Sequence, residues 1–280
     1  MDYPASVINV GLVNGKFANE DPASGTPGSL IPAEWGNAVT EEIRNVIKAA
    51  GLVPDEANLT QMVRAIRAIT RGASVKVFAS AGTFSYTPSA GVTRLVVTVI
   101  GAGGGGGGAT SSANYNAAGG GGGAGGCAKK TILDPPAGTA ISVQVGVGGA
   151  AGATGAANGT AGGTTSFGSY CSATGGSAGN STTAPTNSAA TAAGNDGGVG
   201  SNGDFNWRGD SGQPGVADAP SVSGRSVAGG AGGSSALSGG SRGSPAIFGC
   251  GGGGGNTSGG NASAAGFTGA PGVVIIEEYF

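Results

Sequence analysis

The stretch RLVVTVIGAGGGGGG, residues 94–108, joins a β-branched run to a run of glycine, and the interpretation of the whole chain depends on this junction. The apolar run indicates a strand over Arg94–Ile100. The glycines that follow are either a flexible linker or an extended threefold helix that packs backbone against backbone, because no Cβ intervenes. We favour packing, since the glycine runs leave one strand and return to another. The glycine-rich segments are Gly101–Gly108, Gly119–Gly126, the long polar stretch Gly175–Gly243, and Gly249–Gly260.

Short β-branched or aromatic runs bounded by Gly, Pro or Ser recur after Gly72 and predict strands. About eight such strands predict a mainly β fold, an antiparallel sandwich-like, glycine-rich domain with polyglycine II-type segments. The clear strands are Val75–Phe78, Phe84–Thr87, Arg94–Ile100, Ile141–Val147 and Val273–Tyr279. The weaker ones are Cys127–Leu133, Thr164–Phe167 and Tyr170–Ala173, and the last two are separated by Gly168 and Ser169 as in a tight hairpin.

Residues 1–72 follow a helical pattern instead. Apolar residues at the spacing of one helix face predict a helix from Glu34 that stops at Gly51, and a second apolar stripe runs over Leu59–Ile69. The preceding stretch, Met1–Ile31, is rich in Gly, Pro, Asn and Ser and reads as an extended arm. We therefore expect residues 1–72 to form an arm plus a helical hairpin, and residues 73–280 to form the glycine-rich β domain.

Composition limits the partners of the chain. Glycine supplies 63 of 280 residues and only 10% of residues are charged, so few side chains can fill a core and oligomerisation is expected to help order the chain. The net charge is −2 and no basic stripe occurs, so we expect no nucleic-acid partner. No apolar run of about 18 residues and no leader pattern occur, so we expect no membrane insertion and synthesis in the cytosol.

The catalytic groups that most enzymes use are missing. The sequence has no His, which removes Ser-His-Asp, Cys-His and most zinc chemistry. The G-x-G-x-x-G pattern of residues 101–106 is not followed by a helical pattern that could hold a pyrophosphate. Cys127, Cys171 and Cys250 are predicted to be free, buried thiols. We expect no catalytic residue, no cofactor and no metal.

Carboxylates are the remaining candidates for chemistry. Adjacent strand residues face opposite sides, so Glu277 and Glu278 cannot easily flank one bond, and we predict that both are solvated. Four aspartates in the long polar stretch could serve as substrate carboxylates or calcium ligands, but their spacing is irregular. They are Asp196, Asp204, Asp210 and Asp218.

Large contact residues gather at one place in the polar stretch. Phe205, Trp207 and Arg208 stand among Gly, Ser and Asn, and Arg208–Asp210 is an Arg-Gly-Asp triplet. Aromatic residues and Arg carry most binding energy at interfaces, so these residues are candidate binding residues. The alternative is that Phe205 and Trp207 plug a loop onto the β core. The predicted binding residues are Tyr115, Phe205, Trp207, Arg208 and Asp210, with Arg225 and Arg242 as further candidates.

Several motifs resemble tail fibre proteins of tailed bacteriophages. The N-terminal ones are VGLVNGKF at 10–17, PGSLIPAEWGN at 27–37 and AGLVPD at 50–55. The remainder is similar to the glycine-rich domain that ends many such fibres, through TTSFG at 164–168, ATGG at 173–176 and the closing strand Gly269–Tyr279. The match covers most of the chain outside Ser177–Gly243.

This resemblance implies a homotrimeric, short fibre located in the virion. Its N-terminal region would attach to tail or baseplate proteins. Its glycine-rich domain would act as an adhesin for a bacterial surface receptor, which could be a glycan, an outer-membrane protein or a pilus. We place the binding loops in residues 109–118 and 177–248. Two alternatives remain at this stage, a tail-associated depolymerase that uses paired carboxylates and a purely structural glycine-rich virion protein.

Overall fold

The computed structural model describes residues 4, 8–25, 27–69, 73–186, 188–218, 227–236 and 247–280. Contacts divide the chain into two compact units, Met1–Gly72 with Phe280, and Ala73–Tyr279. We refer to them as the N-terminal unit and the glycine-rich unit.

The N-terminal unit contains two helices, α1 (Ala33–Ala49) and α2 (Gln61–Ile69). The predicted stop of α1 is confirmed, because Gly51 has φ +72° and donates its N–H to the carbonyl of Lys48 at 2.9 Å. Only glycine adopts this left-handed conformation without steric cost. The second helix begins later than predicted, since Leu59 precedes it and is 94% exposed.

The glycine-rich unit begins as a sandwich of two antiparallel sheets, as predicted. One sheet has the order β1 (Ser74–Phe78), β17 (Val273–Tyr279), β3 (Arg94–Ile100), β6 (Cys127–Leu133) and β13 (Phe205–Trp207). The other has the order β12 (Gly200–Ser201), β9 (Cys171–Ala173), β8 (Thr165–Phe167), β7 (Ile141–Val145) and β2 (Gly82–Tyr86). All eight predicted strands are present. Strands β12 and β13 were not predicted, because they lie in the stretch that we interpreted as loop.

A compact apolar core fills the space between the two sheets. Leu95, Val97 and Val99 of β3 meet Val143 of β7 and Phe167 of β8, and all of them are fully buried. Their alternation along each strand is the pattern of a strand with one buried face.

Beyond the sandwich, the glycine runs form a lattice of threefold helices. Within residues 101–108, every third N–H group donates to the same neighbouring segment. Gly101, Gly104 and Gly107 donate to the carbonyls of Gly126, Gly123 and Gly120, respectively. The remaining N–H groups of the run donate to 157–163 and 267–270, and its carbonyls accept from 149–152, 176–182 and 252–255. The run is therefore surrounded on all sides by other segments. This confirms the threefold, packed interpretation over the flexible linker.

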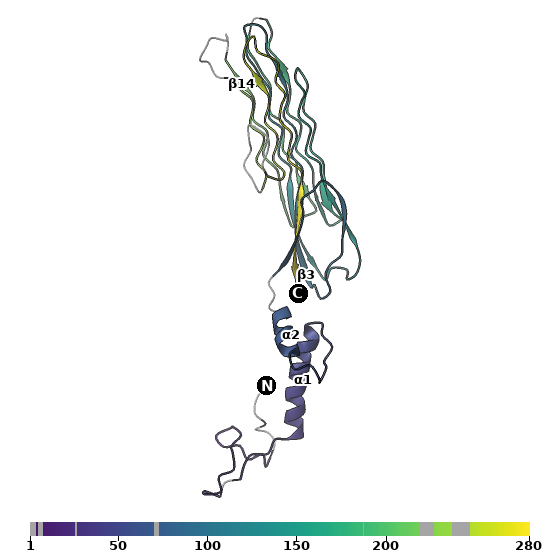
Figure 1. Ribbon diagram of the computed structural model, residues 1–280, viewed down its shortest axis with the longest axis vertical. Helices are drawn as coiled ribbons and strands as arrows, with labels where there is room; N and C mark the ends of the chain where they lie inside the picture. Colours follow the sequence, from purple (N-terminus) through teal and green to yellow (C-terminus); the bar gives the residue numbers. More distant parts are fainter. Residues whose placement is uncertain are drawn as a thin grey trace. The chain divides into compact units, whose positions relative to one another are not determined.

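Residues 119–126 form a second central run with the same arrangement. Their N–H groups donate to 249–255, 174–180 and 210–213, and their carbonyls accept from 101–107, from Gly198 and from 230–233. We call these hydrogen-bonded threefold segments the lattice. In Figure 1 they run side by side from the sheets, where β3 is labelled, to the end where β14 (Val216–Ala217) is labelled.

Turns close the lattice at the end opposite the sandwich. We call the turns at 113–114, 154–156 and 259–260, together with the segment around Thr186, the distal turns. Two-residue ladders flank them. These are β4 (Ala109–Thr110), β5 (Ala117–Ala118), β10 (Thr182–Thr183), β11 (Ala190–Thr191), β14 (Val216–Ala217), β15 (Val227–Ala228) and β16 (Asn256–Thr257).

Glycine falls every third residue on the outer segments of the lattice. In residues 209–215, Gly209, Gly212 and Gly215 are buried, and the residues between them are exposed. A Cβ built on Gly212 would lie within 3.0 Å of the carbonyl oxygen of Gly121. The stretch that we predicted as a long polar loop is therefore largely lattice in its described part, and this corrects the loop assignment of residues 177–248.

Glu278 is also placed differently from the prediction. It is 1% exposed and lies on the inner face of β17, where its carboxylate accepts from the Tyr86 hydroxyl at 2.7 Å and the Ser89 hydroxyl at 3.0 Å. Burial raises the pKa of this carboxyl, but the hydrogen bonds from Tyr86 and Ser89 outweigh burial, so the net pKa is lowered. Burial and the adjacent carboxylate raise the pKa of Tyr86.

The lattice predicts that two adjacent substitutions differ strongly in their effect on stability. Gly212→Ala places a methyl group against the backbone of residue 121 and is expected to lower the free energy of unfolding by about 2 kcal/mol or more. Gln213→Ala, at the next and exposed position, is expected to change it by less than about 0.5 kcal/mol. Urea denaturation of both variants measures the difference. Equal effects would contradict the threefold packing of this segment.

The buried Glu278 carboxylate is predicted to make a contribution to stability that is lost in acid. Because its folded-state pKa is lowered, the contribution is present above the unfolded-state pKa of about 4.3 and is lost as pH falls through the folded-state value. Glu278→Gln should lower the free energy of unfolding at pH 7 by about 1–3 kcal/mol and flatten its decline below about pH 4.3. Glu277→Gln, on the outer face, is the control. Denaturation curves between pH 7 and pH 3 that are parallel for wild type and Glu278→Gln would refute this role.

Candidate functional site

The predicted binding residues Phe205 and Trp207 lie on an edge strand of the sandwich. Strand β13 pairs antiparallel with β6, so that Phe205 lies opposite Lys129 and Trp207 opposite Cys127. Successive side chains of a strand point to opposite faces, and only Asn206 separates the two aromatic residues. Both aromatic side chains therefore project from the same face of the sheet. The pairing fixes the backbone of a strand only three residues long.

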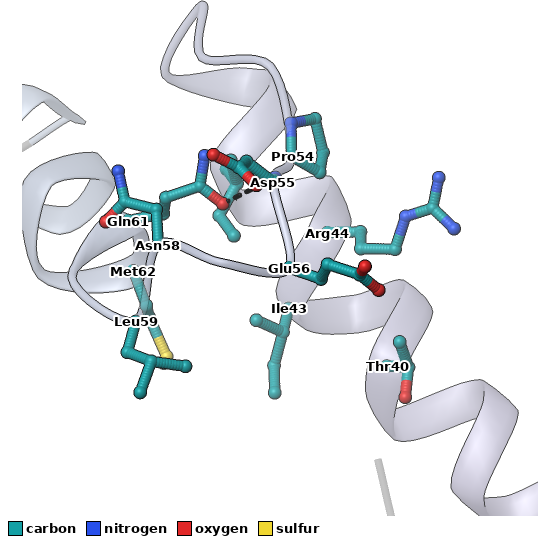
Figure 2. A pocket seen from close by; sticks show the side chains of 11 residues that line it. Thr40, Ile43, Arg44, Pro54, Asp55, Glu56, Asn58, Leu59, Gln61 and Met62 are labelled. Carbon is teal, nitrogen blue, oxygen red and sulfur yellow. Dashed lines mark hydrogen bonds between the residues drawn. The ribbon is translucent and has the colours of Figure 1, made fainter.

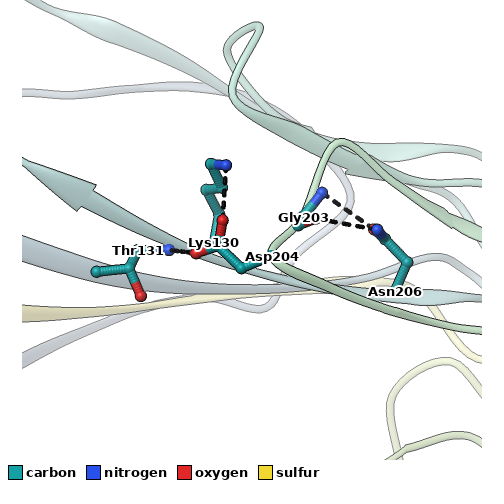
Figure 3. A network of polar contacts seen from close by, with 5 residues as sticks. All are labelled: Lys130, Thr131, Gly203, Asp204 and Asn206. Atoms are coloured by element: carbon teal, nitrogen blue, oxygen red, sulfur yellow. Dashed lines mark hydrogen bonds and ion pairs between the residues drawn. The ribbon is translucent and has the colours of Figure 1, made fainter.

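A polar network holds the start of this strand in place (Figure 3). The Asp204 carboxylate accepts from Lys130 Nζ and from the Thr131 amide, both at 2.7 Å. The Asn206 side chain accepts from the Gly203 amide and donates to the Gly203 carbonyl, both at 3.0 Å. These bonds close the turn that carries Asn202 at φ +60°. The direction of β13 is thus fixed on the side opposite the aromatic rings.

The two aromatic rings remain accessible. Phe205 is 62% and Trp207 47% exposed, and the rings stack with centroids 5.8 Å apart and an angle of 19° between their planes. Neither residue belongs to an apolar core cluster of the described chain. The alternative in which they plug a loop onto the β core is therefore wrong.

Trp207 forms one wall of a cavity of about 470 Å³ beside β13. Buried Gly125, Ile100 and Cys127 line it together with polar residues from β3, β6 and two lattice segments. The polar lining residues are Thr98, Lys129, Arg208, Asp210, Ser234 and Ser235. We call this cavity and the two aromatic rings the edge site.

The Arg-Gly-Asp triplet is part of this wall and not a loop tip. The Arg208 guanidinium pairs with the Asp196 carboxylate at 3.1 Å. Gly209 packs in the lattice, since a Cβ there would lie within 3.0 Å of the Gly125 carbonyl oxygen. The Asp210 backbone donates to Ser234 and accepts from Ala124, which leaves its exposed carboxylate beside the cavity.

Titratable groups near the edge site are poorly suited to catalysis. Hydrogen bonds from Lys130 and the Thr131 amide lower the pKa of Asp204, so it is a poor proton donor near neutral pH. Burial raises the pKa of Cys127 to about 11 and that of Cys171 to about 12, which disfavours the reactive thiolate. The described residues contain no group of three or more acidic, Cys or His side chains able to hold a metal ion.

Tyr115 lies apart from the edge site, among the distal turns. At about 3.1 Å per residue, the lattice run 101–108 spans about 25 Å between the sandwich and this end. The Tyr115 ring packs, half-buried, on an alanine cluster of Ala109, Ala117 and Ala184. The structure thus does not bring all predicted binding residues together. Arg225 and Arg242 lie outside the described residues.

Asn116 ties distal turns to one another and was not predicted. It is 2% exposed, its side-chain amide donates to the Asp218 carbonyl at 3.0 Å, and its side-chain oxygen accepts from the Gly259 amide at 3.0 Å. Ser112 adds a bond from its hydroxyl to the Pro185 carbonyl at 3.0 Å. Four segments distant in sequence are thereby fixed as one surface. Only the flanking glycine periodicity could have suggested their proximity.

The N-terminal unit has a hollow of about 820 Å³ between α1 and the start of α2 (Figure 2). Ile43 and Met62 line it, and the Gln61 side chain closes one end by accepting from the Asp55 amide at 2.9 Å. In the portion of the chain that is described, neither helix is long and apolar enough to cross a membrane.

Comparison with known proteins places the glycine-rich unit in a family. A search of curated proteins finds no match to the chain. The family model described as a glycine-rich domain matches residues 79–279, which is most of the chain and nearly all of the glycine-rich unit. The chain therefore belongs to the glycine-rich domain family.

Proposed function

We propose that this protein is a phage tail fibre protein whose glycine-rich unit binds a receptor on the bacterial surface. The observation that carries the proposal is the lattice, whose backbone hydrogen bonds, together with side-chain bonds of Asn116 and Ser112, hold ordered, non-repeating polar turns at a fixed place. A rigid scaffold with variable-looking turns at its end suits recognition, because little conformational entropy is lost on binding.

The distal turns are pre-organised for such contacts. Asn116 and Ser112 link their backbones, and Tyr115 rests on a small apolar cluster with part of its ring exposed. Among the described side chains, no buried nitrogen or oxygen atom is without a hydrogen-bond partner. Ser, Asn and Tyr at a surface provide adaptable hydrogen bonds and a rigid amphipathic ring.

The N-terminal unit has exposed apolar residues that favour contact with other protein chains. Met62, Val63 and Ile69 on α2 are about half exposed, so the helical hairpin leaves apolar surface uncovered within one chain. Exposed apolar surface of this kind marks a protein contact. We propose that it packs in a homotrimer and attaches to tail or baseplate proteins, and that the protein acts in the virion, after synthesis in the host cytoplasm, without enzymatic activity.

Cell binding tests the proposed function. Fluorescently labelled full-length protein is expected to bind a subset of a panel of bacteria. Asn116→Ala removes the link between distal turns and should reduce binding at least about threefold while the lattice stays folded, because a net hydrogen bond contributes about 0.5–1.5 kcal/mol. Gln213→Ala, at an exposed lattice position, is the matched control and should bind like wild type. Absence of binding to every strain by a folded assembly would favour a purely structural role.

A further inference from the structure

We infer that the edge site is a binding site for a sugar ring of a surface polysaccharide. This inference rests on the proposed function and adds a ligand class and a second contact site to it. The site lies on the side of the sandwich, so it is distinct from the distal turns that Tyr115 and Asn116 occupy.

The shape of the edge site suits one small, rigid group. A volume of about 470 Å³ falls within the range of about 300–1,000 Å³ typical of small-molecule sites. A protein partner generally requires a contact of about 800 Å² on each side, with aromatic residues that anchor a broad and mostly flat surface. Here Trp207 stands at a concave site, with Ile100 and Cys127 buried at its base.

The aromatic wall matches the apolar side of a sugar ring. The C–H groups of a pyranose gather on one face and pack on aromatic rings. Trp207 and Phe205 are stacked and exposed, and the Asp204 and Asn206 networks fix the strand that carries them. The rings therefore do not have to be ordered when a ligand binds, which removes part of the entropic cost of binding.

The charges at the cavity match a hydroxyl-rich ligand better than an anion. Lys129 and Asp210 line it with opposite signs, and within the described chain neither side-chain charge has a hydrogen bond or an ion pair. Arg208 is paired with Asp196. A phosphate or a polyanionic chain would meet the unpaired Asp210 carboxylate and be repelled. Sugar hydroxyls can donate to Asp210 and accept from Lys129 at the same time.

Intrinsic fluorescence tests the ligand class directly. The chain has two Trp residues, so Trp35→Phe leaves Trp207 as the only one. Trp35 lies in the N-terminal unit, where it packs edge-on against Phe17. Full-length Trp35→Phe protein is titrated with purified O-antigen, capsular polysaccharides and peptidoglycan fragments. We expect at least one of them to cause a saturable change in Trp207 emission.

Three variants locate the binding. Asp210→Asn in the Trp35→Phe background keeps the fluorophore and should weaken binding about tenfold, because it removes a charged hydrogen-bond acceptor at an exposed position. Trp207→Ala, followed by calorimetry, should abolish binding. Phe267→Ala removes another exposed aromatic ring, held on the lattice by its backbone bond to Gly253, and should change nothing. Unchanged affinity in Asp210→Asn and Trp207→Ala would overturn the assignment of the site.

Binding to treated bacteria separates this inference from the proposed function. Periodate destroys vicinal diols of glycans, and protease removes surface proteins. Adhesion that is lost after periodate and retained after protease supports the saccharide site. Adhesion that is lost only after protease, with no saccharide response, overturns the inference and leaves the adhesin standing. A saccharide response without adhesion to any bacterium retains the site and contradicts the proposed function.

Discussion

Close packing of backbone against backbone is the constraint on which the glycine-rich unit depends. At most lattice glycines that face a neighbouring segment, a Cβ would collide with a carbonyl group, as at Gly105 with Ala150 and at Gly122 with Gly104. The two central runs have neighbours on all sides and are therefore almost continuous glycine. Outer segments need glycine only every third residue, as at Gly266, Gly269 and Gly272. Hydrogen bonds satisfy the closely packed amides, so order does not require large side chains.

The sandwich sets the register of this lattice. The last residue of β3, Ile100, lies opposite the first residue of β6, Cys127. The next hydrogen bond runs from the Gly101 amide to the Gly126 carbonyl. The ladder thus passes directly into the threefold segments. Glycine runs alone would pair equally well after a slip of three residues, whereas the alternating apolar residues of the strands allow one register. The side-chain core is small, but it selects the arrangement that the backbone bonds then stabilise.

Much of this fold follows from local sequence patterns. The helix stop at Gly51 and the eight strands were predicted, because each depends on residues near one another in sequence. The packing of the glycine runs was predicted from their position between strands, although their hydrogen-bond partners are distant in sequence. The stretch 175–243 was read as loop, since its threefold glycine spacing is interrupted by polar residues that look like loop composition. Strand β13 was missed because three residues carry no clear periodicity. The burial of Glu278 depends on Tyr86 and Ser89, which lie far away in sequence.

Contacts between residues distant in sequence also limited the prediction of the candidate site. Phe205, Trp207, Arg208 and Asp210 were predicted from residue type alone. The structure places Trp207, Arg208 and Asp210 at one cavity, and Phe205 stacks on Trp207 beside it. Lys129 and Asn116 were not predicted, because the pairing of β13 with β6 places Lys129 at the cavity wall and the packing of the lattice places Asn116 at the junction of the turns. In a scaffold of this kind, exposed lattice residues can change while buried glycines cannot, because only the buried positions exclude a Cβ.

Amide hydrogen exchange of the central runs tests the account most directly. If the lattice is held by backbone hydrogen bonds between segments of the chain, the amides of residues 101–108 and 119–126 will exchange as slowly as those of β3, through unfolding of the whole glycine-rich unit. Exchange of these glycine amides at the rate of an unstructured peptide, while β3 stays protected, would show that the runs are flexible linkers and would contradict the account.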